Sequence, residues 1–230
     1  MIISHEHKFI FLKTRKTAGT SVELALSHLC GPDDVITPIS PTDEPLRNNG
    51  RTAQNWRTHG WWQSRRPLLR RYWLKTNPVD YGFYNHIPAK EARELIGDDR
   101  IWRSYFKFAF ERNPWDRQVS AYHFRYRRKD NPPPFSDYMH HKRRAWINNY
   151  EIYSIDGAPC VDFIGRFETL TEDFRKALQQ LGLSFDQELP RAKGNYRQIR
   201  KPYRDYYDEE TRAIVADWYA PEIRYLGYQF

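Results

Sequence analysis

A short segment near the N-terminus combines positive charge, hydroxyl groups and a glycine, which together suit an anion. It follows the apolar run Phe9–Leu12, which predicts a short buried strand, and it leads into a helix predicted from Thr20 to about Leu29. The first N–H groups of a helix lack carbonyl partners and carry partial positive charge, so a phosphate is favoured there. Gly19 lets the backbone approach a ligand closely. The residues expected to hold the anion are Lys13, Arg15, Lys16, Thr17, Ala18, Gly19, Thr20 and Ser21.

Two other interpretations of this segment are open. Thr20 and Glu23 match the spacing of a capping box, which would explain Thr20 without a ligand. A cap requires no cations in the preceding loop, however, and three are present. A Walker A loop needs a lysine directly after its second glycine. Here the lysine precedes the one glycine of the loop, so that motif is excluded.

A second candidate anion site begins at Arg112. Phe106–Phe110 predicts a strand, and Asn113 followed by proline predicts the start of a helix, since Asn caps helices and Pro suits their first turn. Ser120 lies about two turns into that helix, near enough to share one anion with Arg112. A helix start explains Asn113 and its neighbours but gives no reason for Arg112 or Ser120.

Both segments resemble the nucleotide-binding motifs of sulfotransferases that use 3′-phosphoadenosine 5′-phosphosulfate (PAPS). Residues 16–21 are similar to the loop that binds the 5′-phosphosulfate, and residues 112–122 are similar to the 3′-phosphate motif. The resemblance implies that Arg112 and Ser120 bind the 3′-phosphate and that Lys16 stabilises charge on the departing phosphate. It covers residues 8–29 and 85–230.

Further matches imply further roles. His86 lies in a His-x-Pro element whose histidine is the catalytic base in family members, and an imidazole with an ordinary pKa near 6.5 can act as a base near neutrality. His59 is a competing candidate. Phe167 matches an aromatic residue near the adenine. Lys193 and Gly194 partly match a late loop that completes the 3′-phosphate site.

The expected fold is α/β: a three-layer, P-loop-like domain spanning residues 1–230, with a central parallel sheet flanked by helices. Residues 31–81 contain six prolines and interrupt the pattern, so they predict an irregular inserted lobe that faces the substrate or is disordered. The other predicted elements are a short helix near Gln63–Leu74, a helix from Pro88 to Gly97, a strand over Val161–Phe167, a helix that Thr169 and Glu172 cap and Gly182 ends, and a last helix from Asp208 to Tyr219.

Composition narrows the classes of partner and compartment. The net charge of +8 favours an anionic partner. Two cysteines cannot build a disulfide framework, and the N-terminal apolar run is too short for a signal peptide or a membrane span, so the expected location is the cytoplasm. No metal is expected, because His140 and His141 are adjacent and neither cysteine has a partner at ligand spacing.

The function predicted from the sequence is transfer of a sulfuryl group from PAPS to a hydroxyl or amine, with a carbohydrate or acidic glycan as acceptor. A P-loop nucleotide kinase is one alternative, although the Walker lysine and a strand-end Asp for Mg²⁺ are not found. A nucleic-acid-binding module is the other, because basic runs at 65–71, 125–129 and 142–144 are interleaved with aromatic residues. Such runs are more often solvated surface, so no nucleic acid is expected, and the oligomeric state is open.

Overall fold

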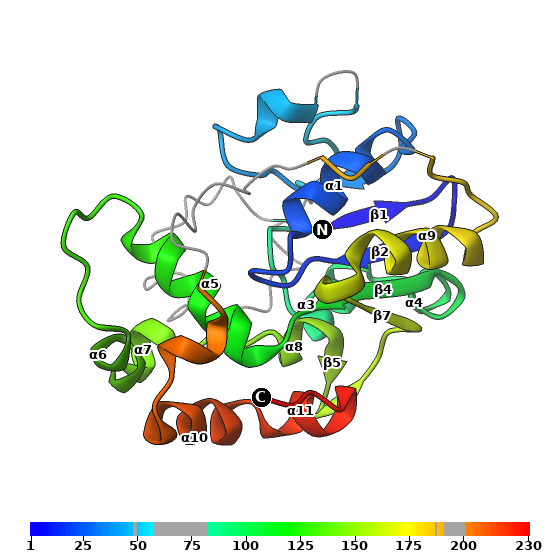
Figure 1. Cartoon of the computed structure of the whole chain (residues 1–230). Coiled ribbons are helices and arrows are strands. Elements are labelled where there is room, and N and C mark those ends of the chain that lie inside the picture. The colour runs from blue at the N-terminus through cyan, green and yellow to red at the C-terminus, as the bar shows by residue number, and fades with distance from the viewer. Residues whose placement is uncertain (48–49, 58–81, 187, 191–200) are drawn as a thin grey trace, which may run out of the picture.

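A mixed sheet forms the centre of the chain. The structure, a computed structural model, describes residues 1–47, 50–57, 82–186, 188–190 and 201–230. Within these residues the largest sheet has five strands in the order β3-β1-β2-β4-β7 (Figure 1). The strands are β1 (Ile2–Ser4), β2 (Phe9–Leu12), β3 (Val35–Ile36), β4 (Phe106–Glu111) and β7 (Phe163–Arg166).

Strands β2, β4 and β7 are parallel, with Leu12 opposite Ala109 and Glu111 opposite Arg166. Their carboxyl ends therefore lie along the same edge of the sheet. The predicted parallel sheet is confirmed for these three strands, but β1 departs from it, because β1 is antiparallel to both β2 and β3. Only residues 5–8 join β1 to β2, and a link that short permits a hairpin but no crossover.

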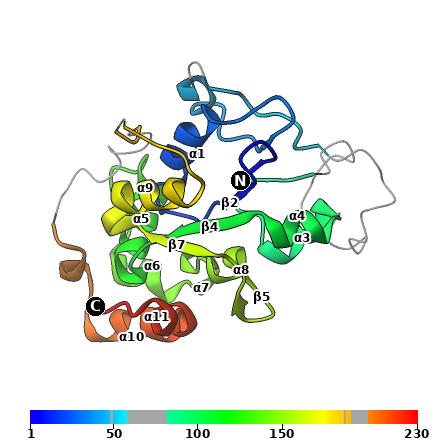
Figure 2. The same ribbon diagram turned by 90° about the vertical axis from the view of Figure 1, so that its right-hand side faces the viewer.

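Helices cover both faces of the sheet (Figure 2). The side chains of β2 alternate between the faces, as expected for a strand buried on both sides. Phe9 and Phe11 pack with helices α1 (Gly19–Ser27) and α9 (Leu170–Gln180). Ile10 and Leu12 pack on the opposite face. The helices on that face are α3 (Ala89–Ile96), α4 (Asp99–Ser104) and α8 (Tyr150–Tyr153).

A third hydrophobic cluster, rich in tyrosine, lies beside the sheet. Helix α5 (Pro114–Tyr126) contributes Trp115, Val119, Tyr122 and Tyr126, so the predicted apolar face of this helix is confirmed. The other elements of this part of the chain are α6 (Phe135–His140), α7 (Lys142–Ala145), η4 (Tyr203–Tyr206), α10 (Glu209–Trp218) and α11 (Ala220–Leu226). A small hairpin of β5 (Ser154–Ile155) and β6 (Ala158–Pro159) follows α8.

The helix boundaries largely follow the sequence signals. Asn113 caps α5 as predicted, its side chain accepting from the N–H groups of Trp115 and Asp116. Helix α3 begins one residue after Pro88 and ends at Gly97, which is left-handed. The predicted capping box at the start of α9 was wrong. The hydroxyl of Thr169 donates to the Asp173 carboxylate (2.8 Å) instead of capping the helix, and a 3₁₀ turn, η3 (Phe167–Thr169), precedes α9.

Part of the predicted insertion is ordered against the sheet edge. Strand β3 and the 3₁₀ turn η1 (Glu44–Arg47) lie in the segment that was expected to be irregular. The helix predicted near Gln63–Leu74 lies outside the described residues. None of the helices in the described ranges has both the length and the hydrophobicity needed to cross a membrane.

Candidate functional site

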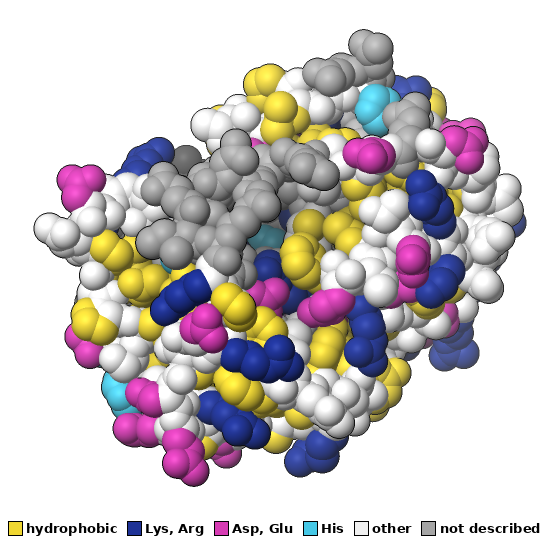
Figure 3. Space-filling view, in the orientation of Figure 1, with side chains coloured by type: hydrophobic (Ala, Val, Ile, Leu, Met, Phe, Trp, Pro, Cys, Tyr) yellow, Lys and Arg dark blue, Asp and Glu magenta, His cyan; other side chains and the backbone are white. Residues whose placement is uncertain are grey.

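A cavity of about 1390 Å³ lies at the carboxyl ends of the parallel strands. The space-filling view shows the molecule hollowed near its centre, with basic side chains in the hollow (Figure 3). In the described ranges eight lining side chains are lysine or arginine, and one is a carboxylate, Asp116. The sequence-predicted residues that line the cavity are Lys13, Arg15, Lys16, Ala18, Gly19, Thr20, Ser21, His86, Arg112, Ser120 and Phe167.

Three predicted site residues do not appear in this lining. Thr17 is buried, and its hydroxyl lies 2.8 Å from that of Thr14, inside the loop. Any contact of Thr17 with a ligand would thus come from its backbone. Lys193 and Gly194, expected to complete the 3′-phosphate site, lie outside the described residues.

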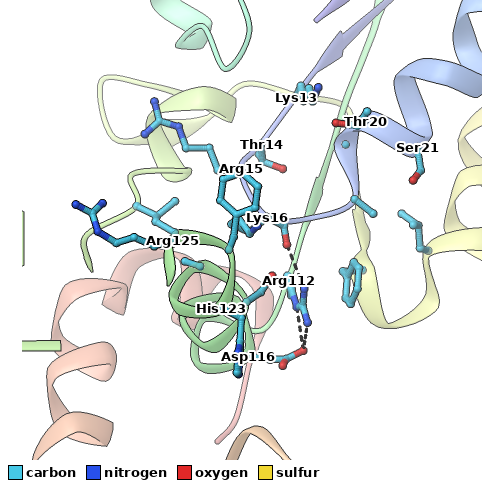
Figure 4. Close-up of a pocket in the computed structure, with 18 of the residues that line it drawn as sticks. Lys13, Thr14, Arg15, Lys16, Thr20, Ser21, Arg112, Asp116, His123 and Arg125 are labelled. Atoms are coloured by element: carbon cyan, nitrogen blue, oxygen red, sulfur yellow. Dashed lines mark hydrogen bonds and ion pairs between the residues drawn. The ribbon is translucent and has the colours of Figure 1, made fainter. Parts of the chain in front are cut away.

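The loop after β2 turns sharply into α1. Lys16 and Ala18 both have positive φ (65° and 59°), and Ala18 occupies the N-cap position. The capping-box interpretation of Thr20 was therefore wrong: Thr20 lies inside the helix, whose N-cap makes no side-chain hydrogen bond. Thr20 instead lines the cavity, next to Ser21 (Figure 4). The N–H of Ser21 donates to the Ala18 carbonyl (2.9 Å), so this N–H is already used within the first turn of the helix.

Lys13 is more enclosed than the sequence suggested. Its ammonium lies 2.5 Å from the Glu23 carboxylate, and both side chains are almost fully buried. Burial raises the pKa of Glu23, but the Met1 amino group and Lys13 outweigh this effect and hold the pKa at about 2. A Cβ at Gly19 would lie 2.7 Å from Cγ of Lys13. Gly19 is thus required for the packing of the Lys13 stem.

Arg112 is held on three sides. Its Nε and Nη2 donate to Oδ2 of Asp116 (2.9 and 2.6 Å), and its Nη1 donates to the Lys16 carbonyl (3.3 Å; Figure 4). Its guanidinium carbon also lies 3.9 Å from the centroid of the Phe167 ring. Asp116 was not predicted as a partner of Arg112, although the i,i+4 spacing of the two residues could have indicated the pair.

His86 contacts the loop after β2. Its Nδ1 lies 3.0 Å from the Lys13 carbonyl oxygen. A carbonyl oxygen only accepts, so Nδ1 carries the proton and the neutral ring keeps a lone pair on Nε2. Burial, followed by the charge of Lys13, lowers the pKa of His86 to about 3. The ordinary pKa near 6.5 assumed from the sequence was therefore wrong. His59, the competing base, lies outside the described residues.

The cavity continues past the two predicted motifs toward four arginines. These residues, here called the arginine arm, are Arg15, Arg125, Arg127 and Arg143. Figure 4 shows Arg15 and Arg125 extending to the same side, away from Ser21. Phe124 contacts both the anion-binding loop and the arginine arm. The centroid of its ring lies 4.0 Å from the ammonium of Lys16 and 4.2 Å from the guanidinium carbon of Arg127. Phe124 was not selected from the sequence, since nothing distinguishes it there from a core aromatic.

The described residues contain no group of three or more His, Cys, Asp or Glu side chains that could hold a metal ion. The side chains that line the cavity are instead suited to a larger anion, which arginine, lysine and hydroxyl donors bind directly.

The chain is similar to known proteins over most of its length. Residues 1–229 match the sequence model of the sulfotransferase family. An uncharacterized protein of Archaeoglobus fulgidus is 31% identical over 129 residues, which are 49% of this chain and 99% of that protein. Carbohydrate sulfotransferase 9 of Homo sapiens is 26% identical over 198 residues, which are 69% of this chain. The match spans only 42% of the human protein. No solved structure gives a significant match. On the family match, this chain belongs to the sulfotransferase family.

Proposed function

We propose that the chain transfers a sulfuryl group from PAPS to a hydroxyl or amine of a carbohydrate acceptor. The observation that carries this proposal is the convergence of two separate segments on one cavity. The loop after β2 and the start of α5 both line it, and Arg112 contacts the backbone of Lys16 there (3.3 Å). One nucleotide with a phosphate at each end of its ribose could therefore engage both segments. The strand–loop–helix order at β2 and α1 supports a P-loop-like arrangement within a single domain.

The proposal assigns each end of PAPS to one segment. The 5′-phosphosulfate is held by Lys16, Thr20, Ser21 and the amides at the start of α1, whose dipole favours negative charge. The 3′-phosphate is held by Arg112 and Ser120, and Phe167 lies near the adenine. The guanidinium of Arg112 would then contact both the 3′-phosphate and the Asp116 carboxylate. Lys193 and Gly194 remain candidates for the same phosphate.

The reaction moves one sulfuryl group without oxidation or reduction. The acceptor oxygen or nitrogen forms a bond to sulfur, the bond between sulfur and the 5′-phosphate oxygen breaks, and 3′-phosphoadenosine 5′-phosphate (PAP) leaves. Nε2 of neutral His86 accepts the acceptor's proton, and for this step the negative charge of bound PAPS must raise the pKa of His86 from about 3, since nearby anions favour the imidazolium. Lys16 stabilises negative charge on the departing phosphate, which requires its flexible side chain to leave the Phe124 ring. Catalysis of this kind depends mainly on positioning and electrostatics.

The arginine arm is proposed as the acceptor side of the cavity. Its guanidinium groups suit a carboxylate or sulfate on an acidic glycan, because arginine binds such groups in a bidentate way. Trp146 lines the same region and is 47% exposed, so it offers an apolar surface beside the charges. The name of the human relative, carbohydrate sulfotransferase 9, supports a sugar as the acceptor.

Thermal stabilisation by nucleotides tests the donor assignment. PAP should raise the Tm of the protein more than ATP with Mg²⁺ at the same concentration, since only PAP carries a 3′-phosphate. Greater stabilisation by ATP with Mg²⁺ would favour the nucleotide kinase. Labelled PAPS with a panel of neutral and acidic glycans then tests transfer. Salt-sensitive DNA binding in the absence of any PAP effect would favour the nucleic-acid-binding module.

A further inference from the structure

Asn149 joins the loop after β2 to the rest of the site although it does not line the cavity. Its Oδ1 accepts from the N–H of Arg15 (2.9 Å), and its Nδ2 donates to the carbonyl of the same residue (3.0 Å). The two residues are far apart in sequence, and Asn149 is fully buried. An amide side chain is suited to this pair of contacts because it offers a donor and an acceptor side by side.

The same side chain reaches the second anion-binding segment. Nδ2 of Asn149 lies 3.1 Å from Oε1 of Glu111, and that oxygen also accepts from the backbone N–H of Arg112 (2.9 Å). Glu111 is fully buried at the end of β4 and is held in place by Arg117, whose Nη1 lies 2.7 Å away. A continuous chain of hydrogen bonds therefore runs from the backbone of Arg15 through Asn149 and Glu111 to the backbone of Arg112.

This connection differs from the contact between Arg112 and Lys16. The Nη1 contact of Arg112 to the Lys16 carbonyl uses the guanidinium that the proposed nucleotide needs. The Asn149 chain uses only backbone groups and buried side chains, so a ligand can bind without breaking it. Hydrogen bonds between buried polar groups restrict the local geometry of the groups that they join.

We propose that Asn149, acting with Glu111, is a positioning residue that sets the distance between the two anion-binding segments. The inference rests on the proposed binding of one nucleotide by both segments. A ligand with two anionic ends gains affinity over a ligand with one end only when the second site is held at the right distance. Loosening the Asn149 connection should therefore reduce the advantage of a bisphosphate while leaving each single phosphate contact nearly unchanged.

The test compares the Kd values of PAP and of adenosine 5′-monophosphate in wild type and in Asn149→Ala. We expect the Kd of the monophosphate divided by the Kd of PAP to fall by about tenfold in the variant. The Kd of the monophosphate itself should change by less than about threefold. Asn148→Ala is the matched control, since Asn148 is the adjacent residue, of the same type, and its side chain accepts from the Glu151 N–H (3.4 Å). Its ratio should equal that of wild type.

Folding must be checked, because Asn149→Ala removes the partner of the Arg15 N–H and carbonyl and leaves a gap at a fully buried position. Circular dichroism and Tm report on folding, and Asn149→Ser provides a second variant that keeps a polar group in the buried position. A general loss of stability would weaken both ligands together and leave the ratio unchanged. An unchanged ratio in a folded variant overturns the inference. A wild-type protein that does not prefer PAP over the monophosphate overturns the proposed function itself, and the inference with it.

Discussion

Nδ1 of His86 donates a hydrogen bond to the backbone carbonyl of Lys13 (3.0 Å), so the candidate base is held against the anion-binding loop. This contact determines which nitrogen carries the proton and leaves Nε2 as the lone-pair nitrogen. It also orients the ring relative to the loop that is proposed to hold the 5′-phosphosulfate.

Replacing His86 by Asn should remove the base while keeping a side-chain N–H near the Lys13 carbonyl. We expect kcat to fall by about 100-fold, because general base catalysis contributes factors of roughly this size. The Kd of PAP should change by less than about threefold, since His86 is not assigned a phosphate contact. Initial rates with labelled PAPS and titration with PAP measure the two quantities. Wild-type turnover in this variant would reject His86 as the base.

The lowered pKa of His86 predicts a specific loss of stability in acid. In the unfolded chain the imidazole has its ordinary pKa of 6.5, whereas burial and Lys13 lower the folded-state pKa to about 3. Between these values the unfolded state binds more protons, so the free energy of unfolding should decrease as the pH falls from about 6.5 toward 3. Urea unfolding at a series of pH values measures this slope, which His86→Asn should reduce.

The control for that slope is His140→Asn, which replaces a histidine that is 46% exposed. This variant should retain the pH dependence of the wild type. An equal slope in wild type and His86→Asn would show that other groups, and not His86, cause the acid sensitivity.

Replacing Arg112 by Ala should separate the two ends of the nucleotide. The guanidinium is assigned to the 3′-phosphate, so PAP binding should weaken by about 30-fold, corresponding to the loss of a charge-assisted hydrogen-bonded contact of about 2 kcal/mol. Binding of adenosine 5′-monophosphate, which lacks that phosphate, should weaken by less than about threefold. Calorimetric titrations give both constants. Equal weakening of the two ligands would place Arg112 elsewhere on the nucleotide.

Removing two members of the arginine arm should affect the acceptor and leave the donor unaffected. In Arg125→Ala/Arg143→Ala we expect the KM for an acidic glycan such as chondroitin to rise by about tenfold, while the KM for PAPS stays within about twofold. Carboxyl-reduced chondroitin should show no such difference between variant and wild type, because it lacks the charge that the arm is proposed to bind.

Arg100→Ala/Arg103→Ala is the charge-matched control. Both side chains are highly exposed on α4, which precedes β4 at the edge of the sheet opposite the cavity. This variant loses the same net charge and should keep both KM values. An equal effect in the two double variants would mean that overall charge, and not the arm, attracts the acceptor.

The sequence by itself was enough to predict the two strand-to-helix junctions. Gly19, Asn113 and the proline after it act within a few residues of their own positions, so their effects on turns and helix starts can be read locally. The apolar run Phe9–Leu12 likewise indicated a buried strand, and the resemblance to PAPS-dependent sulfotransferases implied that Arg112 and Lys16 serve one ligand. The structure brings these two residues into contact.

Other properties were decided only by tertiary structure. Lys13 was expected to bind the anion, but folding buries its ammonium against Glu23. The pKa of His86 falls below its ordinary value because the ring is buried next to the charge of Lys13. Asn149 contacts Arg15 across more than half of the chain, which no local pattern encodes. Burial and long-range hydrogen bonds depend on which segments become neighbours in space. The order of the strands in the sheet determines those neighbours, and no local stretch of sequence specifies that order.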